Sequence, residues 1–318
     1  MTEASRPRIL VTGASGQVGW ELRRCLQPLG DVTATEFDAQ GAQASGAQCV
    51  LNLADPDSIR SVLREVRPQI IVNAAAYTAV DLAEDDVDAA MAINANAPGV
   101  LAEEAKREGV VLVHYSTEYV FDGAQDGAYR EDDTTNPLSV YGRSKLAGER
   151  AIQQINPAHL ILRTSWVYGI RGKNFLLTIL RLARERPELN VVDDQIGAPN
   201  WSRLLAAATA HILISQFGSA RDWADSVQQL QAVSGIYHLS SHGATSWCEF
   251  ARAIVAAAAA KDEATCEVRG IPTEQYPTRA QRPKNSRLCT DKLAATFGIS
   301  LPTWDEALRL CMQDMPRV

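Results

Sequence analysis

The first half of the chain alternates short apolar runs with longer segments of helical spacing. Six runs are apolar throughout and evenly spread: Ile9-Leu10-Val11, Val32 to Ala34, Val50-Leu51, Ile70-Ile71-Val72, Val110 to Val113 and Leu160-Ile161-Leu162. Strands that are buried on both faces of a parallel sheet have this pattern. Helical spacing lies between them, from Gln17 to Pro28, from Asp55-Pro56 onward, from about Asp86 to Arg107 and from Ser139 to Gln154. The alternation predicts an α/β fold with a doubly wound parallel sheet.

The second half of the chain lacks this alternation. Helical spacing continues there from Asn174 to Arg186, from Ser202 to Gln216 and from Trp247 to Lys261. We therefore predict a first domain of residues 1–165, to whose sheet some later segments return. A smaller α-rich domain of residues 166–318 follows it. The segment from Ala39 to Gln48 is poor in large apolar side chains and is predicted to be a surface loop.

Composition narrows the class of protein. The 318 residues carry a net charge of −7, and a general nucleic-acid binder would show a basic surplus instead. The six cysteines include no C-x-x-C pair, and the five histidines show no metal-ligand spacing, so no metal site is predicted. His114 is interpreted as a packed histidine within a strand. The stretch Met1 to Pro7 has no apolar signal core, and the longest aliphatic run, Ala253 to Ala260, is too short to span a membrane. These features favour a cytoplasmic protein.

The first predicted strand runs directly into a glycine-rich turn. Gly13, Gly16 and Gly19 have the spacing G-x-x-G-x-x-G and open a predicted helix. Glycine allows the sharp turn, the close approach of backbone to a pyrophosphate and the tight packing of helix on sheet. The helix start directs its amide groups at the phosphates. The position of the turn therefore predicts a dinucleotide site on a Rossmann-type sheet.

The second predicted strand ends at an acidic residue. Glu36 follows Gly13 by 23 residues, close to the roughly 20 expected for the carboxylate that binds the adenosine ribose. A carboxylate there would repel a 2′-phosphate. The cofactor is predicted to be NADH or NADPH, with NADH favoured by Glu36.

Tyr141 and Lys145 are spaced i, i+4 on a predicted helix and share one of its faces. Reduction of a carbonyl by hydride requires a proton for the resulting alkoxide. A free tyrosine has a pKa near 10, and a nearby ammonium favours the phenolate and lowers that pKa. Thr117 ends a predicted strand 24 residues earlier, where its hydroxyl can reach the phenol. The three residues predict a carbonyl-reducing site at the carboxyl end of the sheet.

At this point the sequence resembles the extended short-chain dehydrogenase/reductase family, and within it the dTDP-4-dehydrorhamnose reductases. The resemblance covers nearly the whole chain. The segments that carry it are Gly13 to Leu22 (GASGQVGWEL), Val72 to Asp81 (VNAAAYTAVD), Tyr115 to Phe121 (YSTEYVF), Asn136 to Glu149 (NPLSVYGRSKLAGE), Arg163 to Tyr168 (RTSWVY), Asp194 to Pro199 (DQIGAP) and Arg282 to Leu288 (RPKNSRL). The first and fourth segments are shared across the larger family. The third, fifth and sixth are more particular to these reductases.

The resemblance implies roles for individual residues. It implies Tyr141 as the proton donor, Lys145 as its partner and Thr117 as the hydroxyl that tunes it. It implies substrate contacts from Thr117, Glu118 and Trp166, where an aromatic face suits a deoxysugar. The residues implied to hold the cofactor are Gly13, Gly16, Gln17, Val18, Gly19, Glu36, Asn52, Leu53, Ala74, Ala75, Ala76, Thr78 and Tyr115, together with Tyr141 and Lys145.

Three positions depart from the pattern of these reductases, which usually carry Asp where this chain has Glu36, Asn52 and Glu118. Glu36 keeps the charge, and the Asn52 carbonyl can still accept from an adenine amine. Glu118 is one methylene longer than the usual Asp, so its implied substrate contact departs most from the pattern of the reductases. Some relatives dimerise through a metal bound by acidic residues. That set is not matched here, so the oligomeric state, a homodimer included, stays open.

The implied reaction is reduction of dTDP-4-dehydro-β-L-rhamnose to dTDP-L-rhamnose, the last step of dTDP-rhamnose biosynthesis. The implied partner is thus a dTDP-sugar. Two alternatives stay open: another sugar-nucleotide epimerase or reductase, and a non-catalytic regulatory subunit resembling that of methionine adenosyltransferase. The basic side chains Arg279, Arg282 and Lys284 either bind the nucleotide diphosphate or form a solvated loop.

Overall fold

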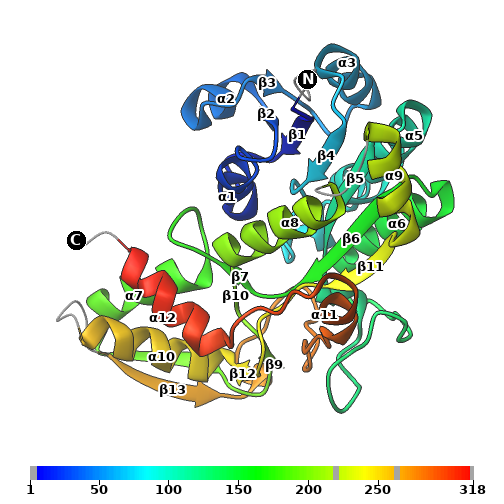
Figure 1. The fold of residues 1–318 in the computed structure, drawn as a ribbon. Helices are drawn as coiled ribbons and strands as arrows, with labels where there is room; N and C mark the ends of the chain where they lie inside the picture. Colours follow the sequence, from blue (N-terminus) through cyan, green and yellow to red (C-terminus); the bar gives the residue numbers. More distant parts are fainter. Residues whose placement is uncertain (1–5, 218–221, 261–265, 316–318) are drawn as a thin grey trace.

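A seven-stranded parallel sheet forms the centre of the molecule. The computed structural model describes residues 6–217, 222–260 and 266–315, and so Met1 to Ser5 and Lys261 lie outside it. The strands are in the order β11-β6-β5-β4-β1-β2-β3, and each pairs in parallel with its neighbours (Figure 1). Their bounds are β1 (Arg8–Thr12), β2 (Asp31–Glu36), β3 (Cys49–Val50), β4 (Ile70–Asn73), β5 (Val111–Thr117), β6 (His159–Thr164) and β11 (Gly235–His238). All six predicted strands are confirmed, and β11 is an addition at the sheet edge.

Helices cover both faces of this sheet. Ile9, on one face of β1, belongs to a core shared with α1 (Gln17–Cys25), α8 (Ser202–Phe217), α9 (Trp223–Ala232) and α11 (Asp291–Phe297). Leu10 points the opposite way, into a core shared with α3 (Pro56–Val66), α5 (Ala97–Glu108) and α6 (Val140–Ile155). Alternate residues of a strand face opposite sides, so a strand that is apolar throughout must be covered twice. The doubly wound fold is therefore confirmed.

Local capping explains where the predicted helices begin. Asp55 accepts a hydrogen bond from the amide of Asp57, and Pro56 occupies the first turn of α3. Ser139 accepts from the amide of Gly142 at the start of α6. The segment predicted as one helix from Asp86 to Arg107 comprises α4 (Val87–Met91), the π-helical turn η2 (Ala92–Asn96) and α5.

The expectation of a loop from Ala39 to Gln48 is wrong. Residues Ala39–Ser45 form the helix α2. Asp38 accepts a hydrogen bond from the amide of Gly41 at 2.7 Å, and Gly46 ends the helix in the left-handed region at φ 67°. Both caps stabilise a short helix even though it buries no side chain fully.

A second lobe lies below the sheet in Figure 1. Its core joins side chains such as Leu176 and Phe250 from α7 (Phe175–Glu185), α10 (Trp247–Ala259) and α12 (Trp304–Asp314). The remaining elements are β7 (Val167–Tyr168), β8 (Glu188–Val192), β9 (Ile196–Gly197), β10 (Asn200–Trp201), β12 (Thr245–Ser246), β13 (Glu267–Ile271), η1 (Leu82–Glu84), η3 (Glu118–Val120) and η4 (Thr273–Gln275). Because α8, α9 and β11 follow residue 165 and yet pack on the central sheet, the chain passes between the lobes more than once.

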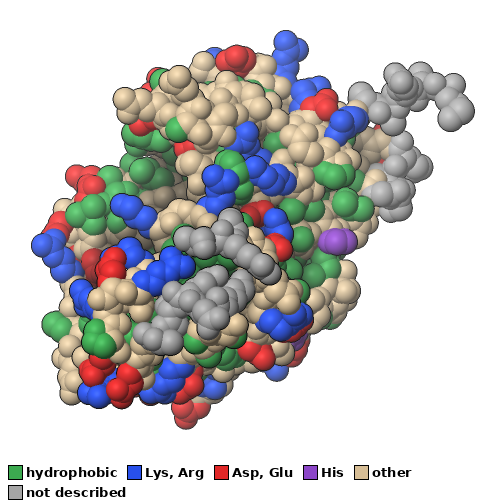
Figure 2. All heavy atoms as spheres, turned by 90° about the vertical axis from the view of Figure 1, so that its left-hand side faces the viewer, with side chains coloured by type: hydrophobic (Ala, Val, Ile, Leu, Met, Phe, Trp, Pro, Cys, Tyr) green, Lys and Arg blue, Asp and Glu red, His purple; other side chains and the backbone are tan. Residues whose placement is uncertain are grey.

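The outer helices of this lobe pair their surface charges locally. Arg181 bonds Glu185 on α7 at 2.8 Å, and Arg309 bonds Glu306 on α12 at 2.7 Å. Figure 2 shows acidic and basic side chains intermingled on this face of the molecule. Such exposed pairs add little stability, and the mixture gives this face no strong field of one sign.

Candidate active site

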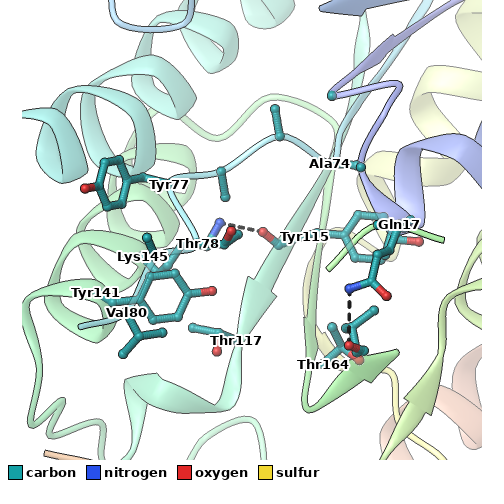
Figure 3. A pocket seen from close by; sticks show the side chains of 18 of the residues that line it. Gln17, Ala74, Tyr77, Thr78, Val80, Tyr115, Thr117, Tyr141, Lys145 and Thr164 are labelled. Atoms are coloured by element: carbon teal, nitrogen blue, oxygen red, sulfur yellow. Dashed lines mark hydrogen bonds between the residues drawn. The ribbon is translucent and has the colours of Figure 1, made fainter. Parts of the chain in front are cut away.

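A cavity of about 1010 Å³ lies at the carboxyl ends of β1, β4, β5 and β6. It extends from the glycine-rich turn to side chains of the second lobe such as Trp247. Figure 3 shows part of its lining, from Gln17 to Tyr141. Open parallel sheets bind ligands at this end because the loops there converge on a crevice. The predicted site residues that line it are Gly13, Gly16, Gln17, Val18, Glu36, Leu53, Ala74, Ala75, Ala76, Thr78, Tyr115, Thr117, Glu118, Tyr141, Lys145 and Trp166.

The glycine-rich turn forms one end of the cavity. Gly13 has φ 69°, and a Cβ there would lie 2.9 Å from the Cα of Ala75. A Cβ on Gly19 would overlap the carbonyl oxygen of Gly13, so this glycine serves the packing of α1 and does not line the cavity. Gly16 is the N-cap of α1 and offers no side chain to the first amides of the helix. A helix start left open in this way suits an anion such as a pyrophosphate.

Some buried polar atoms of the cavity wall have no hydrogen-bond partner within the described part of the protein. Among the described residues, Gln17 Oε1, Ser116 Oγ and Thr164 Oγ1 are buried without any hydrogen-bond partner. All three residues line the cavity. Unsatisfied buried polar atoms are rare in native proteins and call for an explanation such as a bound group. These atoms therefore fit a polar ligand, and the cavity of about 1010 Å³ has room for one as large as a dinucleotide.

Of the three residues expected near the adenosine, Glu36 and Leu53 line the cavity and Asn52 does not. Glu36 is 8% exposed and accepts a hydrogen bond from the amide of Ser15 in the glycine-rich turn. Its carboxylate thus stands beside the turn at the end of β2. Asn52 does not line the cavity, and its side-chain oxygen accepts from the amide of Ala54 at 3.0 Å.

Lys145 has a buried amino group that faces the strand β5. Its Nζ donates to the carbonyl oxygen of Tyr115 at 2.6 Å and lies 3.1 Å from Nε2 of His114. Burial lowers the pKa of Lys145 to about 8, against the opposing effect of Glu149. The helix α6 therefore presents a lysine that exchanges its proton near neutral pH.

Tyr141 corrects one expectation. The ammonium of Lys145 was expected to lower the pKa of this phenol, but burial raises it above its ordinary value, and the charge of Glu118 acts in the same direction. A hydrogen bond with Thr117 acts in the opposite direction. Burial dominates because the phenolate loses its hydration, while the amino group of Lys145 contacts β5. The phenol is therefore neutral and holds a proton that it can donate.

Glu118 joins the same cluster from η3. Its carboxylate accepts a hydrogen bond from the Thr117 hydroxyl at 2.8 Å, and both side chains are buried. Burial raises the pKa of Glu118 to about 7. Figure 3 shows Thr117, Tyr141 and Lys145 grouped in one part of the cavity.

An aromatic wall closes the cavity on the side of the second lobe. Trp166 adopts a left-handed backbone at φ 44° and stacks on Trp247 with centroids 3.6 Å apart. Phe175 packs against Trp247 at 4.6 Å, and all three side chains line the cavity. Trp247 and Phe175 were not predicted as site residues, because each opens a helix whose pattern indicated only a core.

The basic stretch after Thr278 is paired with acidic side chains. Arg282 bonds Asp81 at 2.9 Å and Lys284 bonds Asp194 at 3.2 Å, while Arg279 pairs with Asp85. Arg282 also lines the cavity. Arg279 and Lys284 are 66% and 62% exposed and so belong to a solvated surface, whereas Arg282 is 29% exposed.

Two further properties concern the described part of the chain. It contains no group of three or more His, Cys, Asp or Glu side chains arranged to hold a metal ion. No helix within it is both long enough and apolar enough to cross a membrane.

The fold and the site together define a class of protein. A doubly wound sheet, a glycine-rich turn on β1, and Thr117, Tyr141 and Lys145 in one cavity are the features of an extended short-chain dehydrogenase/reductase. Comparison with known proteins gives the particular family. The family described as "RmlD substrate binding domain" matches residues 7–317, and this chain belongs to it.

Curated relatives and solved structures agree with this assignment. The dTDP-4-dehydrorhamnose reductase of Burkholderia thailandensis is 45% identical over 312 residues, which are 97% of this chain and 99% of that protein. The enzyme of the same name from Salmonella typhimurium is 42% identical over 309 residues, 96% of this chain and 97% of its own. A crystal structure of dTDP-4-dehydrorhamnose reductase from Bacillus anthracis in complex with NADP has a TM-score of 0.82 and 32% identity, covering 98% of this chain and all of that one.

Proposed function

We propose that this protein reduces the 4-keto group of dTDP-4-dehydro-β-L-rhamnose to give dTDP-L-rhamnose, the last step of dTDP-rhamnose biosynthesis. The observation that carries the proposal is the meeting of Thr117, Tyr141 and Lys145 with Trp166 in one cavity that also contains the glycine-rich turn. The names of the Burkholderia and Salmonella relatives supply the substrate. NADH or NADPH, when bound, supplies the hydride that adds to C4.

The proton for the reduced oxygen comes from the neutral phenol of Tyr141. Tyr141 keeps its proton in the buried site and donates it to the O4 oxygen as negative charge develops there. The hydroxyl of Thr117 donates to Glu118 and accepts from the phenol, so it holds the phenol in position until the keto oxygen takes that proton. Lys145 holds the nicotinamide ribose on the β5 side of the site. The phenolate that remains is neutralised by a proton from solvent, which closes the cycle.

The cofactor is held by the glycine-rich turn and by the loop after β4. Gly13 and Gly16 bring backbone close to the pyrophosphate, and Glu36 receives the adenosine ribose, which favours NADH. The other residues proposed to contact the cofactor are Gln17, Val18, Leu53, Ala74, Ala75, Ala76, Thr78 and Tyr115. Gly19 acts through the packing of α1, and Asn52 is more distant.

The sugar lies between the sheet and the second lobe. Trp166 and Trp247 line the cavity together, and an apolar deoxysugar face packs well against aromatic side chains. Thr117 and Glu118 meet its polar groups. In this proposal residues 1–165 form the cofactor domain, and residues 166–318, of which later segments return to the sheet, form the sugar-nucleotide domain, with Thr117 and Glu118 contributing from the first.

The proposal extends to the setting of the enzyme. Its partner is a dTDP-sugar, a soluble metabolite, so we place the enzyme in the cytoplasm. The net charge of −7 argues against a nucleic-acid partner. The oligomeric state, a homodimer included, is to be measured in solution.

The test is a coupled assay with product identification. The preceding pathway enzymes generate the 4-keto-6-deoxy-L-sugar nucleotide in place, and the absorbance of NADH or NADPH is followed. Oxidation of the cofactor with dTDP-L-rhamnose as product is the expected result.

Each alternative has its own outcome. A tightly held NAD with interconversion of sugars and no net consumption of cofactor would identify an epimerase. A folded protein that oxidises neither cofactor, and that captures a synthetase in stoichiometric amount, would identify the regulatory subunit.

A further inference from the structure

His114 is a buried titratable group that the proposed reaction does not use. It lies on β5 and is 1% exposed. Its two ring nitrogens each have a polar neighbour: Nε2 lies 3.1 Å from the amino group of Lys145, and Nδ1 lies 2.9 Å from the side-chain amide of Asn73. The ring thus connects the lysine of the candidate site to the strand β4.

The contacts continue across the sheet to the cofactor end of the cavity. The Asn73 side chain lies 2.6 Å from the Thr12 hydroxyl, which in turn accepts a hydrogen bond from the amide of Ala75 at 3.1 Å. Asn73 and Thr12 are each 1% exposed. Thr12 and Ala75 line the same cavity as Lys145. A continuous buried network therefore links the lysine to the glycine-rich end of the site.

The ring is neutral in this network. Burial, reinforced by the positive charge of Lys145, holds the pKa of His114 well below its usual range. A neutral imidazole has one donor nitrogen and one acceptor nitrogen. If Nε2 donates to Lys145, Nδ1 must therefore accept from Asn73, and if Nε2 accepts from Lys145, Nδ1 must donate to Asn73.

The network can satisfy either charge state of the lysine. When the Asn73 nitrogen donates to Nδ1, the ring carries its proton on Nε2 and donates to a neutral amine. When the amide is turned by half a turn, its oxygen accepts from Nδ1–H, and Nε2 accepts from an ammonium. The Thr12 hydroxyl can either donate to Asn73 or accept from it, so the same atoms serve both arrangements.

We propose that His114 is the positioning residue that holds the amino group of Lys145 at the cavity in both of its charge states. Tyr115 supplies the fixed contact through its carbonyl oxygen, at 2.6 Å, and His114 supplies the contact that reverses. A buried lysine that changes its charge state would otherwise leave an unmatched donor or acceptor in one of the two states. Such unmatched buried groups are costly.

Other groups also act on the charge of Lys145. Glu149, one turn along α6, favours the ammonium, and Glu149 is itself paired with Arg163 of β6 at 2.6 Å. Tyr141 lies on the same face of α6, while Asn73 and Thr12 on the neighbouring strands are uncharged. Removal of the His114 ring leaves all of these in place, so its own contribution can be measured.

The direct test is the titration of Lys145 in the full chain. The protein has six lysines, so [ε-¹³C]lysine labelling gives few resonances, and Lys145→Arg identifies the one in question. An ammonium that loses an acceptor in a buried site is disfavoured more than the neutral amine that loses a donor, because charge-assisted hydrogen bonds are the stronger ones. His114→Phe should therefore lower the midpoint of Lys145 by about one pH unit.

Three variants make the test specific. The shorter side chain of His114→Asn reaches towards Asn73 but not to Lys145, so this variant should shift the Lys145 midpoint as His114→Phe does. It is used in place of His114→Phe if that variant fails to fold. His114→Gln places an amide near the position of Nε2 and should restore the midpoint. His159→Phe removes a buried histidine of the neighbouring strand β6, whose Nδ1 contacts Pro157 instead, and should leave it unchanged.

The meaning of the inference for catalysis rests on the proposed function, but the titration needs no substrate. If the enzyme is the proposed reductase, the alkaline limb of its kcat profile should shift with the same variants, in the same order. Absence of reductase activity would refute the proposed function and leave the titration readable. A Lys145 midpoint that is equal in wild type, His114→Phe and His114→Asn would overturn the positioning role.

Discussion

The hydroxyl of Thr117 donates a hydrogen bond to the carboxylate of Glu118 across 2.8 Å of buried space. A hydroxyl has one proton, so while this bond exists Thr117 can only accept from Tyr141. Since burial raises the pKa of Glu118 to about 7, the partner of Thr117 changes its charge in the physiological range. The hydrogen bond between Thr117 and Glu118 therefore affects the free energy of unfolding and its dependence on pH.

Glu118→Gln should weaken the dependence of folding stability on pH. Between pH 4.5 and pH 7 the native carboxyl holds a proton that the unfolded chain releases, so the free energy of unfolding of wild type falls as pH rises through this window. This group's contribution to the fall is on the order of 3 kcal/mol. Urea unfolding at pH 4.5 and pH 7.5 should show a smaller fall for Glu118→Gln. Glu103→Gln, an exposed change on α5, should behave as wild type, and equal falls in all three proteins would contradict the account.

Lys145→Met should raise the stability of the protein and lower its activity. The native pKa of Lys145 is about 8, below that of a free lysine, so its charge destabilises the folded state at lower pH, and this cost disappears as pH rises from about 8 towards 10.5. The variant should therefore gain more in Tm over wild type at pH 6.5 than at pH 9.5. Its kcat should fall at least about 100-fold. Thermal unfolding at the two pH values checks the first statement, and a gain that grows with pH would refute it.

Cofactor preference should depend on Glu36. Its carboxylate stands beside the glycine-rich turn, where it would repel a 2′-phosphate. Glu36→Gln should raise kcat/KM for NADPH relative to NADH by about tenfold, which corresponds to about 1.4 kcal/mol. Asp31→Asn, at the exposed start of the same strand, is the control and should leave the ratio unchanged. An unaltered ratio in Glu36→Gln would remove this residue from the determinants of preference.

Gly197 supports the aromatic wall by having no side chain. A Cβ there would lie 2.7 Å from Cε2 of Trp166, so Gly197→Ala must displace the indole ring. The KM for the sugar nucleotide should rise about fivefold, since an aromatic contact of this kind contributes roughly 1 kcal/mol. Gly99→Ala on α5, where the nearest atom would be 3.5 Å away, should have little effect. Equal KM values in both variants would show that Trp166 does not contact the sugar.

The sheet and its catalytic edge could be predicted because they depend on local patterns. Runs such as Ile9-Leu10-Val11 must be strands when both faces are buried, and Gly13 marks the turn that follows. The edge strand β11 was missed, because Gly235–His238 is a four-residue segment in a region without alternation. The helix α2 was not predicted because it lacks large apolar residues, and its caps, Asp38 and Gly46, lie outside the helix itself.

Contacts between elements were harder to anticipate. The spacing of Tyr141 and Lys145 shows only that they share a face of α6. How that face docks on β5 decides that Lys145 meets His114 and the Tyr115 carbonyl, and that burial dominates the pKa of Tyr141. The stack of Trp166 on Trp247 joins positions 81 residues apart through the second lobe, and no local pattern records it.

In the proposed reaction Tyr141 donates the proton that accompanies hydride transfer. Tyr119 is a matched control, because it lines the same cavity and its ring packs edge-on against that of Tyr141 at 5.4 Å. Tyr141→Phe and Tyr119→Phe should be compared with wild type for oxidation of NADH in the coupled assay and for binding of NADH by fluorescence. We predict that Tyr141→Phe binds NADH normally but loses a factor of about 10² to 10⁴ in kcat, while Tyr119→Phe stays within about threefold of wild type. A Tyr141→Phe enzyme that reduces the keto sugar at the wild-type rate would contradict the account.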